Sequence, residues 1–199
     1  MKEDASAADD LRLVLKAQRG DREAVDALVS RYQKLAYQYA WRLCRDADEA
    51  ADVVAEAFAR VYTGIARFRK ESRFSTWFYR IIVNCYLDMR KREKRHQHNS
   101  IEKEVELEEG EVFRQFASEA TGPDTAAEES LRTTLLSNAI AELPEMHRVM
   151  IVMYHVEMLE YEEIAAALGL PVGTVKSRLN RARLALKELL APHMELFAR

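Results

Sequence analysis

Residues 161–179 read YEEIAAALGLPVGTVKSRL, and this stretch decides the fold of the second half of the chain. A helix-turn-helix motif needs a small residue where its helices cross and a turn residue that tolerates positive φ. It also needs an apolar inner face on the second helix. Ala165 and Gly169 meet the first two requirements, and Val172, Val175 and Leu179 provide the inner face. The stretch therefore predicts two short helices separated at Gly169.

The second of these helices carries polar side chains on its outward face. Residues four apart stack along a helix, so four side chains form two outward rows and two arginines flank them. Lys and Arg can bind phosphates or guanine edges, and Asn and Ser can hydrogen-bond bases in the major groove. A solvated basic face on an ordinary helical hairpin is the alternative, but the turn pattern favours DNA binding. The candidate contacts with duplex DNA are Lys176, Ser177, Arg178, Asn180, Arg181 and Arg183.

Charge is segregated along the chain although the net charge is only −3. Residues 60–96 hold eleven Lys or Arg against three Asp or Glu, and residues 169–199 hold six against two. Residues 97–130 reverse the balance, with two basic and ten acidic residues. For binding to a polyanionic partner, the local clustering of basic residues matters more than the net charge of the whole chain. Two basic regions separated by an acidic connector therefore indicate a nucleic-acid-binding protein.

The composition and the apolar pattern predict an all-α chain with two small domains. Apolar residues recur at helical spacing over residues 9–96, where we expect four helices, with Asp21 as a cap and Gly20 at the end of the first helix. The helical spacing of apolar residues is lost over residues 97–130, which we interpret as a flexible acidic linker. The spacing resumes over residues 131–193. We expect this linker to leave the two domains loosely tethered.

No apolar run reaches the roughly 20 residues of a membrane span, and the first residues lack the apolar core of a signal peptide. A cytoplasmic protein without membrane insertion is expected. Cys44 and Cys85 belong to no metal-binding or redox pair and are interpreted as small core residues.

Aromatic and basic side chains alternate over residues 68–84, FRKESRFSTWFYRIIVN. Single-stranded nucleic acid is bound by this combination, with rings for unstacked bases and cations for the backbone. The competing interpretation assigns Phe74, Phe78, Ile81 and Cys85, at helical spacing, to the core, and we prefer it for those four. Trp77 fits either role, whereas the polar Asn84, within an apolar run, is expected to need a hydrogen-bond partner.

With these motifs in place, the sequence resembles the extracytoplasmic-function (ECF) group of bacterial sigma factors over almost all residues outside 97–130. Residues 21–62 are similar to the part of region 2 that binds the polymerase clamp, and residues 68–88 to the part that melts and reads the −10 element. Residues 143–183 are similar to region 4, which reads the −35 element.

The resemblance assigns roles to individual positions. It implies that Asp52, Glu56 and Phe58 lie on the helix that binds core RNA polymerase. The expected −10 contacts, which form a pocket for a flipped base with Trp77 beside it, are Phe68, Arg69, Lys70, Glu71, Ser72, Trp77 and Asn84.

The implied partners are core RNA polymerase, promoter DNA and an anti-sigma factor, and no cofactor, metal or catalytic residue is expected. A stand-alone helix-turn-helix regulator is the alternative, although it would leave the motifs of residues 21–88 unused. An enzyme is disfavoured because the sequence has no HExxH, P-loop or GxSxG motif. His96 and His98 could be proposed as a metal pair, but histidines in a basic tail are more often surface residues.

Overall fold

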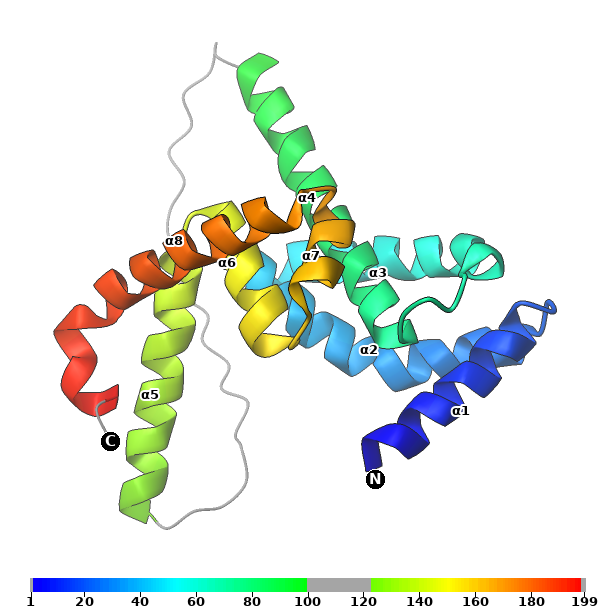
Figure 1. The fold of residues 1–199 in the computed structure, drawn as a ribbon, viewed down its shortest axis with the longest axis horizontal. Coiled ribbons are helices and arrows are strands. Elements are labelled where there is room, and N and C mark those ends of the chain that lie inside the picture. The colour runs from blue at the N-terminus through cyan, green and yellow to red at the C-terminus, as the bar shows by residue number, and fades with distance from the viewer. Residues whose placement is uncertain (1, 100–122, 198–199) are drawn as a thin grey trace.

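Helices account for the regular secondary structure in the computed structural model, which describes residues 2–99 and 123–197. The first domain comprises α1 (Lys2–Ala17), α2 (Arg22–Cys44), α3 (Ala47–Gly64), the 3-10 helix η1 (Ile65–Arg67) and α4 (Phe74–Asn99) (Figure 1). The second comprises α5 (Pro123–Glu142), α6 (Glu145–Ile151), the π-helical turn η2 (Val152–Val156), α7 (Tyr161–Leu168), α8 (Val172–Leu190) and the 3-10 helix η3 (Ala191–Phe197). The predicted all-α, two-domain fold is confirmed. No helix in the described part of the chain is long and apolar enough to cross a membrane.

Capping side chains fix the helix boundaries of the first domain. Asp21 precedes α2, and its carboxylate accepts a hydrogen bond from the backbone N–H of Ala24 at 3.2 Å. Asp46 precedes α3 in the same way and accepts from the N–H groups of Asp48 and Glu49, both at 2.9 Å. Gly20, between α1 and α2, has a φ of +90°, which favours glycine over residues with a side chain. The predicted cap at Asp21 and break at Gly20 are both confirmed.

The core of the first domain lies where α2, α3 and α4 face one another. Phe74 and Phe78 stack with their ring centres 5.9 Å apart, and Tyr32 meets both edge-on. Cys85 is buried beside them, whereas Ile81 is only half-buried. Burial raises the pKa of the Cys85 thiol to about 11, which keeps it protonated as an apolar side chain. The predicted core residues are thus confirmed as buried, except that Ile81 lies at the edge.

The second domain begins earlier than the sequence indicated. Residues 100–122 of the expected linker lie outside the described residues, as do the side chains of His96 and His98. Residues 123–130, also placed in the linker, form the first turns of α5. Pro123 suits the first turn of a helix, where no backbone donor is required, and this local preference explains why the helix begins before the apolar pattern resumes.

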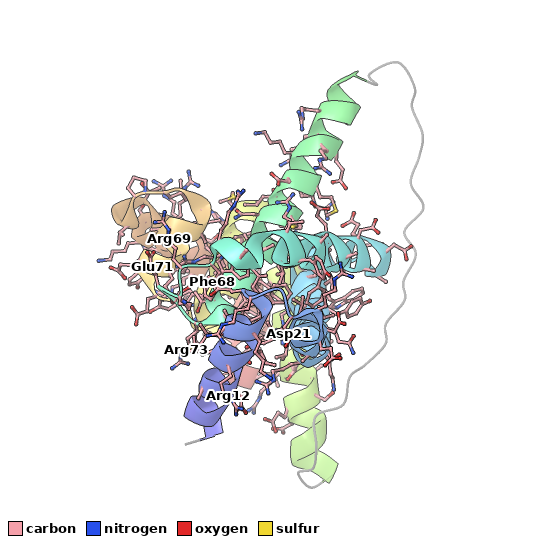
Figure 2. The ribbon with its side chains drawn as sticks, turned by 90° about the vertical axis from the view of Figure 1, so that its right-hand side faces the viewer. Arg12, Asp21, Phe68, Arg69, Glu71 and Arg73 are labelled. Atoms are coloured by element: carbon pink, nitrogen blue, oxygen red, sulfur yellow. The ribbon has the colours of Figure 1, made fainter. Side chains whose placement is uncertain are left out.

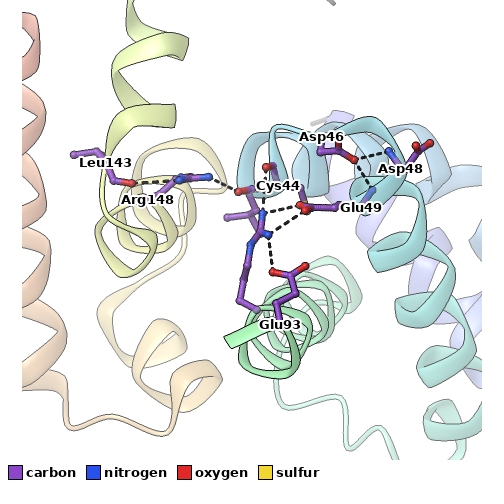
Figure 3. Close-up of polar contacts among 9 residues, drawn as sticks. Cys44, Asp46, Asp48, Glu49, Glu93, Leu143 and Arg148 are labelled. Atoms are coloured by element: carbon purple, nitrogen blue, oxygen red, sulfur yellow. Dashed lines mark hydrogen bonds and ion pairs between the residues drawn. The ribbon is translucent and has the colours of Figure 1, made fainter. Parts of the chain in front are cut away.

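The two domains pack against each other at the C-terminal end of α2 (Figure 3). The last carbonyl oxygens of a helix have no partner within the helix and carry partial negative charge. Arg148 of α6 donates to the oxygen of Leu43 at 2.7 Å and to that of Leu143 at 3.3 Å. Arg90 of α4 reaches the oxygen of Cys44 at 3.4 Å and is held in turn by Glu49, whose carboxylate it contacts at 2.6 Å. The second domain thus supplies a donor that α2 itself lacks.

A buried carboxylate forms a second junction between the domains. The Glu157 side chain is only 9% exposed, lies 3.5 Å from the Arg42 guanidinium and is hydrogen-bonded to the Tyr79 side chain. Burial raises the pKa of Glu157, and these two partners oppose the shift. Arg45 adds a hydrogen bond to Ser137 of α5 at 2.8 Å. The two domains are therefore in direct contact through side chains of α2, α4, α5 and the turn after η2, while the loose tether stays a prediction.

Candidate nucleic-acid interface

The helix-turn-helix forms where the sequence places it. Gly169 closes α7 in the left-handed conformation, with φ +63°, and the N–H of Leu170 donates to the oxygen of Ala165 at 3.0 Å. Pro171 precedes the first residue of α8, and its oxygen accepts from Thr174 at 2.9 Å. The helix α8 has 19 residues and so is not the short helix that the sequence indicated.

The inner face of α8 is buried and its outer face is exposed. Val175 and Leu179 are at most 1% exposed, and Val172 is half-buried at the start of the helix. The predicted base-reading residues are exposed together on the opposite face: Lys176, Ser177, Asn180 and Arg181. Of the two flanking arginines, Arg183 is exposed and Arg178 is half-buried.

Two tyrosines that the sequence analysis did not identify support the basic residues of α8. Tyr154 and Tyr161 stack 5.1 Å apart beside the N-terminus of α7. The Arg183 guanidinium lies over Tyr154 at 4.8 Å, and the Lys176 ammonium lies over Tyr161 at 5.3 Å. Such cation–π contacts restrict where a long basic side chain can point. Only the spacing of seven between the rings was visible in the sequence, and it gave no sign that they meet.

A cavity of about 410 Å³ lies in the first domain between α1, α2 and the loop before α4. Its loop side is formed by Phe68, Lys70, Glu71, Ser72 and Arg73, and Figure 2 shows how Phe68, Arg69, Glu71 and Arg73 cluster beside α1. The helix side is formed largely by Asp10, Leu11, Val14, Tyr32 and Phe74. Most of the predicted −10 loop thus borders one cavity, the size of which suits a small organic ring.

Aromatic stacking and one glutamine shape this cavity. Phe68 is 7% exposed and stacks on the half-buried Trp77, with ring centres 4.8 Å apart. The Gln18 amide donates to the backbone oxygens of Ile65 at 3.0 Å and Phe68 at 2.8 Å, which fixes the start of the loop. Lys70 adopts a φ of +61° within the loop. Glu71 is exposed at the rim, and the exposed Arg69, outside the cavity lining, lies 4.0 Å from its carboxylate.

Asn84 lies apart from this cavity. It is exposed on α4 and is not among the residues that line the cavity, so solvent can supply the hydrogen-bond partner that its side chain needs. Seven residues separate it from Trp77, which places it two turns, about 10 Å, further along the same side of the helix. A nucleic-acid strand running along α4 could pass from the cavity to Asn84, and a contact of Asn84 with the −10 element stays a prediction.

The candidate polymerase contacts occupy two faces of α3. Asp52 and Glu56 are exposed four residues apart, and Glu56 pairs with Arg60 at 2.8 Å. Arg60 also contacts Asp88 of α4 at 3.0 Å and so ties the two helices together. The ring of Phe58 packs 4.8 Å from Phe78 and points inward. The structure therefore brings the two carboxylates together on an accessible face and separates Phe58 from them.

The fold and these two surfaces define an all-helical protein of two domains, one with a helix-turn-helix and the other with an aromatic cavity. Residues 28–96 match the Sigma-70 region 2 family, and residues 133–186 match the Sigma-70 region 4 family. The chain is 36% identical to the RNA polymerase sigma-H factor of Pseudomonas aeruginosa over 185 residues, which cover 92% of this chain and 94% of that protein. It is also 36% identical to the ECF RNA polymerase sigma-E factor of Escherichia coli over 180 residues, 90% of this chain and 93% of that one. The chain belongs to the ECF group of RNA polymerase sigma factors.

Two solved structures share the fold across both domains. The sigma factor RpoE of Bartonella quintana, in complex with the anti-sigma factor NepR, aligns with a TM-score of 0.63 and 22% identity, covering 83% of this chain and 96% of that one. CnrH in complex with the cytosolic domain of CnrY aligns with a TM-score of 0.61 and 24% identity, covering 93% and 99%. At these identities the likeness extends to the fold alone.

Proposed function

We propose that this chain binds core RNA polymerase and directs it to promoters by reading a −35 element with α8 and a −10 element with the first domain. The observation that carries this proposal is the presence, in one sigma-family chain, of two different reading surfaces. One is an exposed polar helix face suited to duplex DNA, and the other is an aromatic cavity with a basic rim suited to an unpaired base. A regulator that binds only duplex DNA has no use for the second surface.

Each surface has a distinct task in this proposal. The face carrying Lys176, Ser177, Asn180 and Arg181 reads base edges, and Arg178 and Arg183 contact phosphates. Phe68 stacks on an unpaired base, while Arg69 and Lys70 attract the strand. Glu71 and Ser72 complete the rim of the cavity, and Trp77 and Asn84 continue the path along α4.

Asp52 and Glu56 are the proposed contacts with core polymerase, because they form an exposed acidic pair on one face of α3. Phe58 contributes by holding α3 against α4. The protein has no catalytic role of its own and needs no cofactor, and it works in the cytoplasm with polymerase. The anti-sigma factor NepR, bound to the sigma factor RpoE in one of the related structures, suggests that this chain also binds an anti-sigma factor.

The decisive experiment combines the purified chain with bacterial core RNA polymerase and a library of promoter DNA. We expect co-elution with the polymerase and transcription from a specific subset of promoters. The free chain should bind the same DNA weakly, because its two domains pack against each other and polymerase is needed to set the spacing of the two surfaces on DNA. Tight, specific binding by the free chain without co-elution would favour the stand-alone regulator.

The Arg181→Ala substitution is expected to weaken holoenzyme binding to the preferred −35 sequence by about 1 to 3 kcal/mol and to remove discrimination at one base pair. Arg181 is exposed, and no hydrogen bond or ion pair within the described residues occupies its guanidinium. Selection from randomised −35 sequences at two salt concentrations measures both effects. The matched control is Arg183→Ala, because Arg183 lies over Tyr154 on the flank of the helix. This substitution should weaken holoenzyme binding to all −35 sequences by the same factor. If Arg181→Ala instead weakens binding to all −35 sequences equally, Arg181 contacts a phosphate and not a base.

A further inference from the structure

One wall of the cavity in the first domain carries a buried charge that the proposed function does not yet use. Asp10 of α1 lines the cavity, and its side chain is only 8% exposed. The other charged residues around the cavity, Lys70, Glu71 and Arg73, are exposed on the loop. A carboxylate buried at the wall of a cavity needs hydrogen-bond donors, so its partners indicate what it can still bind.

Two neighbouring side chains of α2 hold the Asp10 carboxylate in place. The Arg31 guanidinium lies 2.6 Å from one oxygen, and the Tyr32 hydroxyl donates a hydrogen bond to the other. Burial raises the pKa of Tyr32, and the bond to Asp10 raises it further, so this hydroxyl keeps its proton and remains a donor. An ionised carboxylate offers about four lone-pair sites in all. Asp10 can therefore accept further hydrogen bonds from a group inside the cavity.

The walls around Asp10 suit a flat ring. Phe68 and Phe74 line the cavity with aromatic surface, and Lys70 and Arg73 supply positive charge on the loop above. A base flipped out of the stack is read through its Watson–Crick edge. Cytosine, adenine and guanine each carry an exocyclic amino group on that edge, whereas thymine carries a carbonyl oxygen on each side of its N3–H. The single donor of thymine on this edge, N3–H, lies between these two oxygens, and both repel a carboxylate that approaches it, whereas an exocyclic amino group offers its N–H at the end of the edge.

We propose that Asp10 is a specificity-determining residue of this cavity, where its carboxylate accepts a hydrogen bond from the amino group of a flipped base and disfavours thymine. This inference rests on the proposed function, since it takes the cavity to be the site of an unpaired promoter base. It adds a residue from α1, at least 58 positions before the loop, to the −10 reading surface.

The test places each of the four bases at every −10 position of a forked promoter DNA and measures its affinity for the reconstituted holoenzyme. For wild type we expect one position at which thymine binds about tenfold or more weakly than the preferred amino-bearing base. Asp10→Asn should reduce this difference to about threefold or less, because the amide can donate to a thymine oxygen.

The matched control is Asp9→Asn, the same change on the adjacent, exposed residue, which also faces Arg31 but lies outside the cavity lining. It should leave the discrimination intact. A measurement on the DNA side requires no variant: the preferred base is replaced by its analogue without the amino group, namely pyrimidin-2-one, purine or inosine. That change should cost wild type about tenfold in affinity.

Equal affinity for the analogue, or unchanged discrimination in a folded Asp10→Asn variant, would overturn the role of Asp10. Wild-type holoenzyme that forms and binds the promoter yet accepts thymine at every position would also overturn it. Failure of wild type to bind core polymerase or to bind any promoter would instead overturn the proposed function. The two failures are therefore distinguishable.

Discussion

Replacing Arg148 with methionine is expected to lower the free energy of unfolding by about 2 to 5 kcal/mol. Methionine keeps the aliphatic length and helix propensity of arginine but removes both donors. The substitution leaves the backbone oxygens of Leu43 and Leu143 without their side-chain donor, and each buried acceptor that loses its partner costs about 1 to 3 kcal/mol. Urea denaturation measures the loss.

The Arg148→Met variant should also increase the radius of gyration in small-angle scattering, because the contact joins the two domains. Lys94→Met is the matched control, since Lys94 makes an exposed ion pair with Glu145 of α6 at 2.6 Å. Exposed ion pairs contribute little to stability, so the control should leave both measurements nearly unchanged. Equal behaviour of the two variants would show that the carbonyl contacts of Arg148 do not hold the domains together.

The helix-turn-helix was predictable from sequence because its determinants are local. Gly169 must adopt positive φ, Pro171 must precede a helix, and Val175 and Leu179 must point inward, and each requirement can be read within one or two turns of chain. The same holds for the cap at Asp21. Local geometry and hydrogen bonding alone determine these features.

The cavity was only half predictable, because its two sides come from distant parts of the chain. The sequence around Phe68 showed the aromatic and basic side. Asp10 and Gln18 looked like ordinary polar positions on the first helix, and only the tertiary packing of α1 brings them to the loop. Asn84 was grouped with Phe68 by resemblance, and it is exposed on α4, outside the lining of this cavity.

The contact between the domains had no sequence signal at all. Arg148 donates to the backbone oxygen of Leu43, and every residue type carries such an oxygen, so no pairing of charges or apolar residues marks the site. Glu157 could be recognised as important only from its burial beside Arg42 and Tyr79. The acidic segment before α5 indicates a linker between the domains, and nothing in its sequence indicates that the domains also touch.

Replacing Phe68 with leucine is expected to reduce opening of the −10 region by about tenfold or more while leaving −35 binding unchanged. Trp77 stacks against the Phe68 ring, and the cavity also borders this ring. Stacking of an unpaired base on an aromatic side chain contributes about 1 to 3 kcal/mol, and leucine has no flat face to replace it. Leucine nevertheless fills most of the buried volume, so the domain should remain folded.

Permanganate footprinting of the open complex measures melting of the −10 region. A gel shift with −35 duplex measures DNA binding by the exposed face of α8. The matched control is Phe78→Leu, because Phe78 is fully buried in the same core and does not line the cavity. This control should cost at least as much stability, since it removes contacts with Tyr32, Phe58 and Phe74, yet it should melt the promoter normally. If both variants lose melting to the same degree, the effect comes from the fold, and Phe68 has no direct contact with the flipped base.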